Sequence, residues 1–136
     1  MSFKPRILLV DDDTTALELM GEVLSEKDYE VDTSFRVDLA VEKLRTRHYH
    51  AVVTDLKMPE KTGMDLLQYT VDSFPELPVI MLTAYGTIQT AVQALKRGAF
   101  DYISKPVQVE ELALALEKAI SHSQLKAQNS FLRHEL

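Results

Sequence analysis

The amino-acid sequence predicts a doubly wound α/β fold, and three observations support this prediction. Short apolar runs rich in β-branched residues recur along the chain, as in strands that are buried on both faces of a parallel sheet. Segments with the apolar period of an amphipathic helix alternate with these runs, at a spacing of roughly twenty-odd residues, as crossover connections require. The 136 residues, 46% of them hydrophobic, suffice for one domain with a buried core.

The first half of the chain contains three predicted strands and two predicted helices. The runs R-I-L-L-V and A-V-V-T-D predict fully buried strands, whereas Val31, Thr33 and Phe35 alternate as in a short strand. Asp13 or Thr14 is suited to cap the first helix, because either side chain can accept a backbone hydrogen bond. In order, the elements are a strand at residues 6–10, a helix at 14–26, a strand at 31–35, a helix at 37–44 and a strand at 51–55.

The second half of the chain alternates in the same way. Pro59 prevents a helix directly after the third strand, and Gly63 provides a flexible joint before the next helical pattern. Gly98 is placed to end the fourth helix in a left-handed conformation, and Lys105-Pro106 ends the last strand. The elements are helices at residues 64–71, 88–95 and 109–120, and strands at 79–82 and 100–104.

The predicted topology is a five-stranded parallel sheet in the order 2-1-3-4-5 with helices on both faces, a flavodoxin-like three-layer sandwich. Residues 1–120 form this domain. Residues 121–136 either extend the last helix as a frayed end or begin a linker, in which an apolar stripe would support dimer formation. The stripe consists of Leu125, Asn129, Leu132 and Leu136.

The composition argues against several classes of function. A net charge of −6 disfavours nucleic-acid binding by this segment, because a surface that follows phosphates must be basic. The absence of cysteine excludes disulfides and thiolate chemistry. Because no apolar run approaches the length of a membrane span, we expect a cytoplasmic protein.

Polar residues stand at the carboxyl ends of four predicted strands. Asp11 and Asp12 follow the first strand, and Asp55 ends the third. Thr83 and Lys105 stand at the ends of the fourth and fifth strands. Because the carboxyl ends of parallel strands share one edge of the sheet, these five side chains are expected to meet where the strand order reverses.

Three carboxylates at one edge call for a cation, since two of them about 4 Å apart repel by about 4 kcal/mol at an effective dielectric constant near 20. Oxygen ligands, with neither Cys nor His among them, favour Mg²⁺ or Mn²⁺. Asp55 is the natural nucleophile because it is the lone acid at its strand end, which leaves Asp11 and Asp12 to hold the metal ion. Our central hypothesis is therefore that Asp55 accepts a phosphoryl group.

Two further residue types at this edge suit phosphoryl transfer, which needs positioning and charge neutralisation more than covalent chemistry. The ammonium group of Lys105 can offset charge on the phosphoryl oxygens, and the Thr83 hydroxyl can donate a hydrogen bond to one of them. The small side chain of Ala84 would leave the acceptor open to a phosphodonor.

The sequence resembles the receiver domain of bacterial two-component response regulators. The resemblance spans residues 6–120 and rests on the segments I-L-L-V-D-D-D, V-V-T-D-L-K-M-P, V-I-M-L-T-A and A-F-D-Y-I-S-K-P. It implies that the bond between Lys105 and Pro106 is often cis. The roles it implies are phosphorylation at Asp55, metal binding by Asp11, Asp12 and the backbone carbonyl of Lys57, phosphate binding by Thr83 and Lys105, and an aromatic switch at Tyr102.

Within this family, residues 83–106 most resemble the receivers of enhancer-binding transcription activators of the nitrogen-regulation kind. The resemblance implies that a sensor histidine kinase donates the phosphoryl group and that output domains outside this chain control transcription. It also implies that phosphorylation changes a face formed by residues 89–96, the strand of Tyr102 and the last helix, which would contact an output domain or a second copy. Such a domain catalyses only its own phosphotransfer and dephosphorylation.

Two other interpretations remain open. The segment D-D-D-T-T satisfies the D-x-D-x-T pattern of haloacid-dehalogenase-type phosphatases, in which Asp11 would be the nucleophile and Asp13 the acid and base. Against this interpretation, no acidic pair ends the fourth or the fifth predicted strand. A pseudo-receiver, which binds partners without being phosphorylated, would share the predicted fold.

Overall fold

The computed structural model describes residues 3–84 and 87–135, and the side chains of these residues as far as Leu125. Within this range the strands are β1 (Arg6–Val10), β2 (Glu30–Ser34), β3 (Ala51–Asp55), β4 (Val79–Thr83) and β5 (Asp101–Ser104). The helices are α1 (Thr14–Glu26), α2 (Val37–Thr46), α3 (Gly63–Ser73), α4 (Ile88–Lys96) and α5 (Val109–Glu135). Every predicted element is present, and Asp13 is the residue that caps α1.

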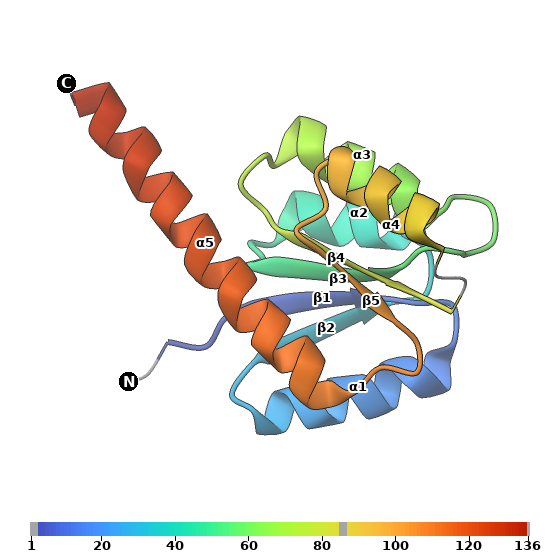
Figure 1. The fold of residues 1–136 in the computed structure, drawn as a ribbon. Helices are drawn as coiled ribbons and strands as arrows, with labels where there is room; N and C mark the ends of the chain where they lie inside the picture. The colour runs from blue at the N-terminus through green and yellow to red at the C-terminus, as the bar shows by residue number, and fades with distance from the viewer. Residues whose placement is uncertain (1–2, 85–86, 136) are drawn as a thin grey trace.

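The five strands form one parallel sheet in the order β2-β1-β3-β4-β5, as predicted. Helices α1 and α5 cover one face of the sheet, and α2, α3 and α4 cover the other (Figure 1). The strand order reverses between β1 and β3, whose pairing sets Val10 beside Thr54. The residues that follow these two strands therefore meet at one edge of the sheet.

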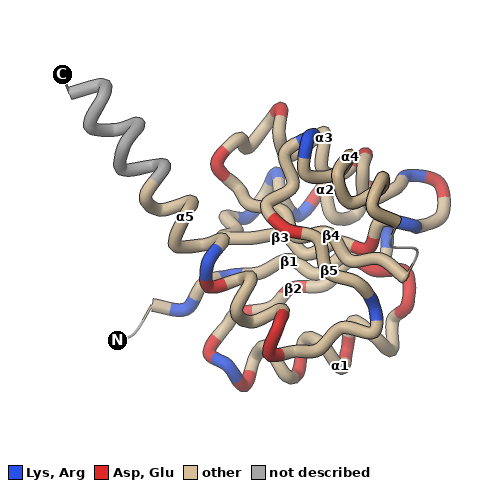
Figure 2. The backbone as a smooth tube through the Cα atoms, viewed as in Figure 1, with Lys and Arg blue, Asp and Glu red and all other residues tan. Residues whose placement is uncertain are grey.

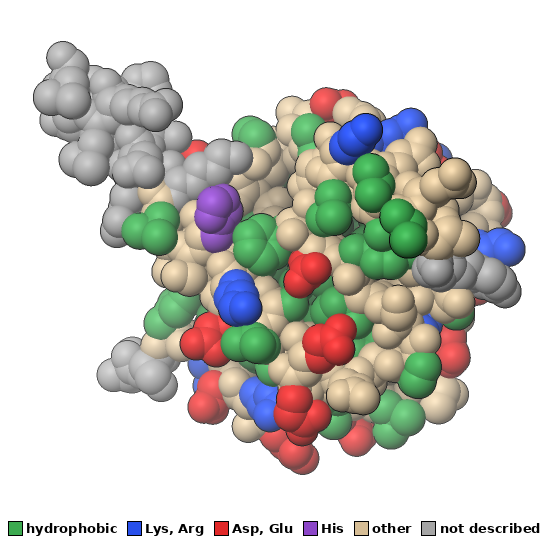
Figure 3. All heavy atoms as spheres, viewed as in Figure 1, with side chains coloured by type: hydrophobic (Ala, Val, Ile, Leu, Met, Phe, Trp, Pro, Cys, Tyr) green, Lys and Arg blue, Asp and Glu red, His purple; other side chains and the backbone are tan. Residues whose placement is uncertain are grey.

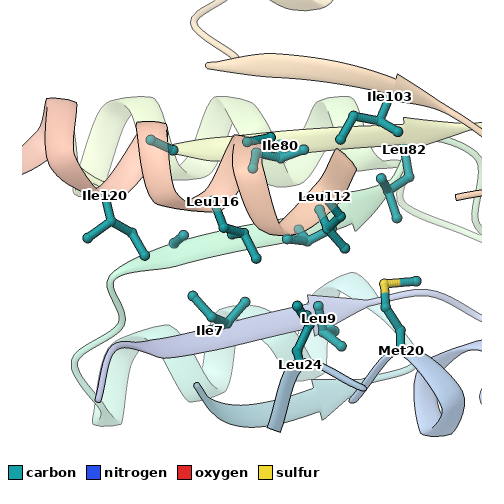
Figure 4. Packing of buried hydrophobic residues seen from close by; sticks show 14 of the residues in the cluster. Ile7, Leu9, Met20, Leu24, Ile80, Leu82, Ile103, Leu112, Leu116 and Ile120 are labelled. Carbon is teal, nitrogen blue, oxygen red and sulfur yellow. The ribbon is translucent and has the colours of Figure 1, made fainter. Parts of the chain in front are cut away.

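Each face of the sheet has its own apolar core. Ile7 and Leu9 of β1 pack under α1 and α5 together with Leu116 (Figure 4). Leu8 and Val10 point to the opposite face and pack with residues of α2 and α3. Because successive strand residues alternate between the two cores, the central strands are buried on both faces and give the carboxyl edge a stiff support.

The last helix is longer than the part that packs on the sheet. Its last buried side chain among the described residues is Ile120, and beyond it the helix projects away from the sheet (Figure 1). Leu125 is 58% exposed, and the other members of the predicted stripe lie outside the described side chains. In the described part of the chain, no helix combines the length and the apolar character that a membrane span needs.

Helix α4 carries an apolar stripe that points to solvent. Ile88, Val92 and Leu95 are 84%, 42% and 46% exposed. Ala94 is the buried residue of this helix, whose residues are all described. Gly98 follows the helix with φ of 114°, the left-handed conformation that the sequence predicted. The orientation of the stripe is unusual for a surface helix, which normally turns such residues to the core.

Helix α3 begins in close contact with the end of β3. Thr62 and Asp65 form a capping box at its start, and Gly63 is its first residue. A Cβ atom on Gly63 would lie 2.3 Å from the Asp55 carbonyl oxygen and 2.9 Å from the Cα atom of Leu56. Gly63 is therefore more than the flexible joint that the sequence predicted, because this contact leaves no space for a side chain.

We expect Gly63→Ala to lower the free energy of unfolding by about 2–3 kcal/mol, because the added methyl group meets backbone atoms that cannot move aside freely. Gly21→Ala is the matched control. Its Cβ would meet nothing closer than a Val31 side-chain atom at 3.6 Å, and Gly21 lies inside α1. Removing that glycine should stabilise the protein by about 0.5–1 kcal/mol. Urea unfolding measures both values, and equal effects of the two substitutions would contradict this account.

Candidate functional site

Four strand ends meet at the carboxyl edge of the sheet. Asp11 follows β1, Asp55 ends β3 and Thr83 ends β4, and these residues are 1%, 8% and 0% exposed. Lys105 follows β5, and its backbone N–H donates to the Thr83 carbonyl oxygen. Figure 2 shows acidic positions where β1 and β3 end. The edge therefore brings together residues that lie far apart in the sequence.

Three carboxylates form a compact cluster at this edge. One oxygen atom each of Asp11, Asp12 and Asp55 lies within 4.8 Å of the other two. Asp12 is exposed, so that the cluster is open to solvent on one side. These oxygen donors match the preference of a hard divalent cation such as Mg²⁺. The side chains present at the edge therefore fit the metal ion that the sequence predicted.

The ammonium group of Lys105 contacts two of these carboxylates. Its Nζ atom lies 2.8 Å from Asp11 Oδ2 and 3.4 Å from Asp55 Oδ2. The ion pair with Asp11 was not predicted from the sequence, in which Lys105 was matched only to a phosphate. A carboxylate as buried as Asp11 needs such a partner, since an isolated buried charge is costly.

The surroundings at this edge shift the pKa of Asp55 and of Lys105. Burial, and then the negative charge of Asp11, raises the pKa of Asp55, although Lys105 acts in the opposite direction. Burial tends to lower the pKa of Lys105, but its hydrogen bond and its charge interactions with the two aspartates outweigh this effect and raise it. Lys105 is therefore a permanent cation at neutral pH, and the ionised form of Asp55 is less stable than that of an ordinary aspartate.

Asp55 opens onto a surface hollow of about 440 Å³. Ala84 is exposed at its wall. Met58 and Pro59 also line the hollow and were not predicted to do so, although they lie only three and four residues after Asp55 in the sequence. The residues that line the hollow are Asp12, Asp55, Lys57, Met58, Pro59, Ala84 and Lys105. The Lys105–Pro106 bond is cis.

Two side chains with roles predicted from the sequence form their hydrogen bonds outside the carboxylate cluster, although the backbone N–H of Asp13 donates to Asp11 Oδ1 at 3.0 Å. Tyr102 is half-buried on β5, and its hydroxyl oxygen is 3.2 Å from Oγ1 of Thr90 in the first turn of α4. Asp13 caps α1 and accepts a hydrogen bond of 3.1 Å from the Ala16 N–H. Because this carboxylate serves as a helix cap, the geometry does not support the acid and base role that the phosphatase pattern requires.

Residues 7–117 match the family described as the response regulator receiver domain. The chain belongs to this family. The prediction from the sequence is confirmed, including the likeness to receivers of the nitrogen-regulation kind. The five-stranded order and the two helical layers are the receiver fold, so that the carboxylate cluster and Lys105 lie at the carboxyl edge of a receiver sheet.

Two curated relatives illustrate the likeness. The response regulator protein PilR of Pseudomonas aeruginosa is 38% identical over 109 residues, which are 80% of this chain and 24% of PilR. The transcriptional regulatory protein GlrR of Escherichia coli is 38% identical over 124 residues, which are 90% of this chain and 28% of GlrR. The receiver thus spans about a quarter of the length of these relatives.

Solved structures agree with this assignment. NtrX from Brucella abortus is 36% identical with a TM-score of 0.88, over 96% of this chain and 30% of NtrX. The beryllofluoride-activated receiver domain dimer of NtrC4 is 30% identical with a TM-score of 0.83, over 87% of this chain and 98% of that chain.

We expect Asp55→Asn to stabilise the metal-free receiver by on the order of 1 kcal/mol at pH 7–8, because it removes a buried charge next to Asp11. Since the pKa of Asp55 is raised in the folded state, its ionisation opposes folding above that folded pKa. This cost disappears as the pH falls below the unfolded-state pKa of about 3.9. Urea unfolding in a chelator from pH 4 to 8 measures the difference, and a difference that does not narrow at low pH would refute this prediction.

Proposed function

We propose that this receiver accepts a phosphoryl group from a sensor histidine kinase onto Asp55 and thereby controls an output. The observation that carries the proposal is the position of the Asp55 carboxylate. It lies at the end of a buried strand, within 3.4 Å of a lysine ammonium and beside an acidic pair, and it opens onto a surface hollow. Such a group is held in place, partly desolvated and reachable by a donor, as a phosphoryl acceptor must be.

Each residue around Asp55 has a separate role in the proposed phosphoryl transfer. One Asp55 carboxylate oxygen bonds to phosphorus as the phosphorus–nitrogen bond of the kinase phosphohistidine breaks. The phosphohistidine ring is protonated on its other nitrogen, so that the electron pair of the broken bond leaves a neutral imidazole beside the new acyl phosphate. Lys105 turns its ammonium group toward the new phosphoryl oxygens, and the hydroxyl of Thr83 donates to another of them. The small Ala84 keeps the line of approach open. In this proposal the domain catalyses only its own phosphorylation and dephosphorylation.

The acidic pair is proposed to serve a divalent cation. Asp11, Asp12, Asp55 and the backbone carbonyl of Lys57 would hold Mg²⁺, or Mn²⁺, which when bound offsets charge on the phosphoryl group. The fit of three carboxylate oxygens within 4.8 Å supports this role. Repulsion among the three carboxylates favours binding of a cation. Without a bound metal ion, Lys105 neutralises part of their charge.

The ion pair of Lys105 offers a route from phosphorylation to a change of shape. New bonds from Lys105 and Thr83 to the phosphoryl group compete with the resting contact between Lys105 and Asp11. A movement of Thr83 at the end of β4 frees space for Tyr102 on β5 to turn inward, away from its contact with Thr90. Shifting a two-state domain from 1:99 to 99:1 takes about 5.5 kcal/mol, a range that several charge-assisted hydrogen bonds can supply.

The surface formed by α4, β5 and α5 is the proposed output face. Figure 3 shows apolar side chains gathered over α4. Ile88, Val92 and Leu95 contribute this exposed stripe, which a helix with no partner would turn to the core. The proposed partners of this face are an output domain that follows residues 121–136 or a second copy of the receiver. We also propose transcription as the controlled output, in keeping with the name of GlrR, and a cytoplasmic location.

The direct test of phosphoryl acceptance is the intact mass of the chain after incubation with a small phosphodonor and Mg²⁺, with the modified residue mapped by reductive trapping. We expect one phosphoryl group on Asp55 and none in Asp55→Asn. A folded, Mg²⁺-binding chain that takes up no phosphoryl group from either the small donor or a kinase would leave a pseudo-receiver. Modification at Asp11 would instead restore the phosphatase interpretation.

The output face is tested by placing a charge in its apolar stripe. We expect Val92→Asp to abolish phosphorylation-dependent association, measured by sedimentation with and without beryllofluoride, because an aspartate at an apolar contact must be desolvated. Leu39→Asp on α2 is the matched control, since Leu39 is 38% exposed and Val92 is 42% exposed. Loss of association in both variants, or in neither, would argue against an output face on α4.

A further inference from the structure

Thr54 is a buried polar residue on β3 that stands directly before Asp55. Its side chain is 0% exposed, and its hydroxyl donates a 3.0 Å hydrogen bond to the Asp55 carbonyl oxygen. Thr54 pairs with Val10 and Met81 in register, so its side chain shares the sheet face that α3 covers. The hydroxyl of Thr54 is not needed for packing, since a valine side chain has nearly the same shape.

Three hydrogen bonds hold the backbone that leads from Asp55 to Lys57. The Thr54 hydroxyl holds the Asp55 carbonyl. The Leu56 N–H donates to the Leu82 carbonyl at 2.8 Å, and the Gly63 N–H donates to the Leu56 carbonyl at 2.8 Å. The peptide group between Asp55 and Leu56 and the one between Leu56 and Lys57 are therefore both fixed in orientation. Lys57 lines the hollow next to Asp55.

The backbone at Gly63 also restricts movement of the Asp55 carbonyl. The site of a Cβ atom on Gly63 is 2.3 Å from this oxygen, so the first turn of α3 lies directly against it. The carbonyl is thus in contact with both a hydrogen-bond donor on β3 and the backbone of α3. Since the direction of a side chain follows from the orientation of its own backbone, this arrangement also determines where the Asp55 carboxylate points.

We propose that Thr54 is a positioning residue for the phosphoacceptor: its hydroxyl fixes the Asp55 peptide group, and through it the Asp55 carboxylate and the Lys57 carbonyl. The inference rests on the proposed function of Asp55. Thr54 touches neither the donor nor the hollow, and it acts through the backbone of the residue that does. The structure offers a matched comparison in Thr70, a second threonine that is 0% exposed and donates to a backbone carbonyl, that of Leu67, at 2.8 Å within α3.

The test compares Thr54→Val, Thr54→Ser and Thr70→Val with the wild-type chain. Each protein is examined for Mg²⁺ affinity by calorimetry, for the rate of phosphoryl uptake at saturating Mg²⁺, and for amide hydrogen exchange at Leu56 and Gly63 without metal. We expect Thr54→Val to weaken Mg²⁺ binding and to slow uptake about 3- to 10-fold each, as the loss of one buried hydrogen bond allows, and to speed exchange at Leu56 and Gly63. Thr54→Ser, which keeps the hydroxyl, should stay within about twofold of wild type in Mg²⁺ affinity and uptake.

Thr70→Val separates positioning from stability, because it also deletes a buried hydroxyl but lies away from the site. We expect it to lose stability against urea to a similar extent as Thr54→Val while keeping Mg²⁺ affinity and uptake near wild type. Equal behaviour of the two valine variants, or a defect in Thr54→Ser with normal Thr54→Val, would overturn the positioning role alone. A wild-type chain that binds Mg²⁺ but takes up no phosphoryl group would overturn the proposed function, and the inference with it.

Discussion

One ammonium group, that of Lys105, lies between two buried carboxylates that stand on different strands. The contact joins the end of β5 to the ends of β1 and β3. It forms only if the three strands end at the same edge of the sheet, so that Lys105 lies within reach of both carboxylates. It also leaves the cluster with more negative than positive charge, since Asp12 is a third carboxylate nearby. The site is therefore held together by attraction to one cation and remains able to attract another.

The stiffness behind this edge comes from ordinary packing. Residues of β1, β3 and β4 alternate between two apolar cores, and α3 is held against β3 by a contact that allows no side chain at Gly63. The packed strands determine where the polar residues at the edge are placed. By contrast, α4 contributes one buried side chain, Ala94, and presents its apolar stripe to solvent. A rigid acceptor and a weakly anchored helix next to it are the two parts that a phosphorylation switch requires.

The sequence predicts the fold and most of the edge because both follow from local patterns. Apolar runs mark the central strands, and the rule that parallel strands share a carboxyl edge brings Asp11, Asp55 and Lys105 together. The rest depends on distances between elements that no local pattern contains. The ion pair of Lys105 with Asp11, the outward stripe of α4 and the tight contact at Gly63 are of this kind. Asp13 shows the converse, since its pattern with Asp11 suggested catalysis, whereas its carboxylate caps α1.

The most direct test of this account is a crystal structure of the receiver with Mg²⁺ and beryllofluoride. The account predicts beryllium bonded to an Asp55 carboxylate oxygen, with the bound group contacted by the Thr83 hydroxyl and by a Lys105 ammonium that has left Asp11. Beryllofluoride bound elsewhere than on Asp55 would contradict the central claim. So would a group on Asp55 that neither Lys105 nor Thr83 contacts, because the convergence of these strand ends would then have no part in holding it.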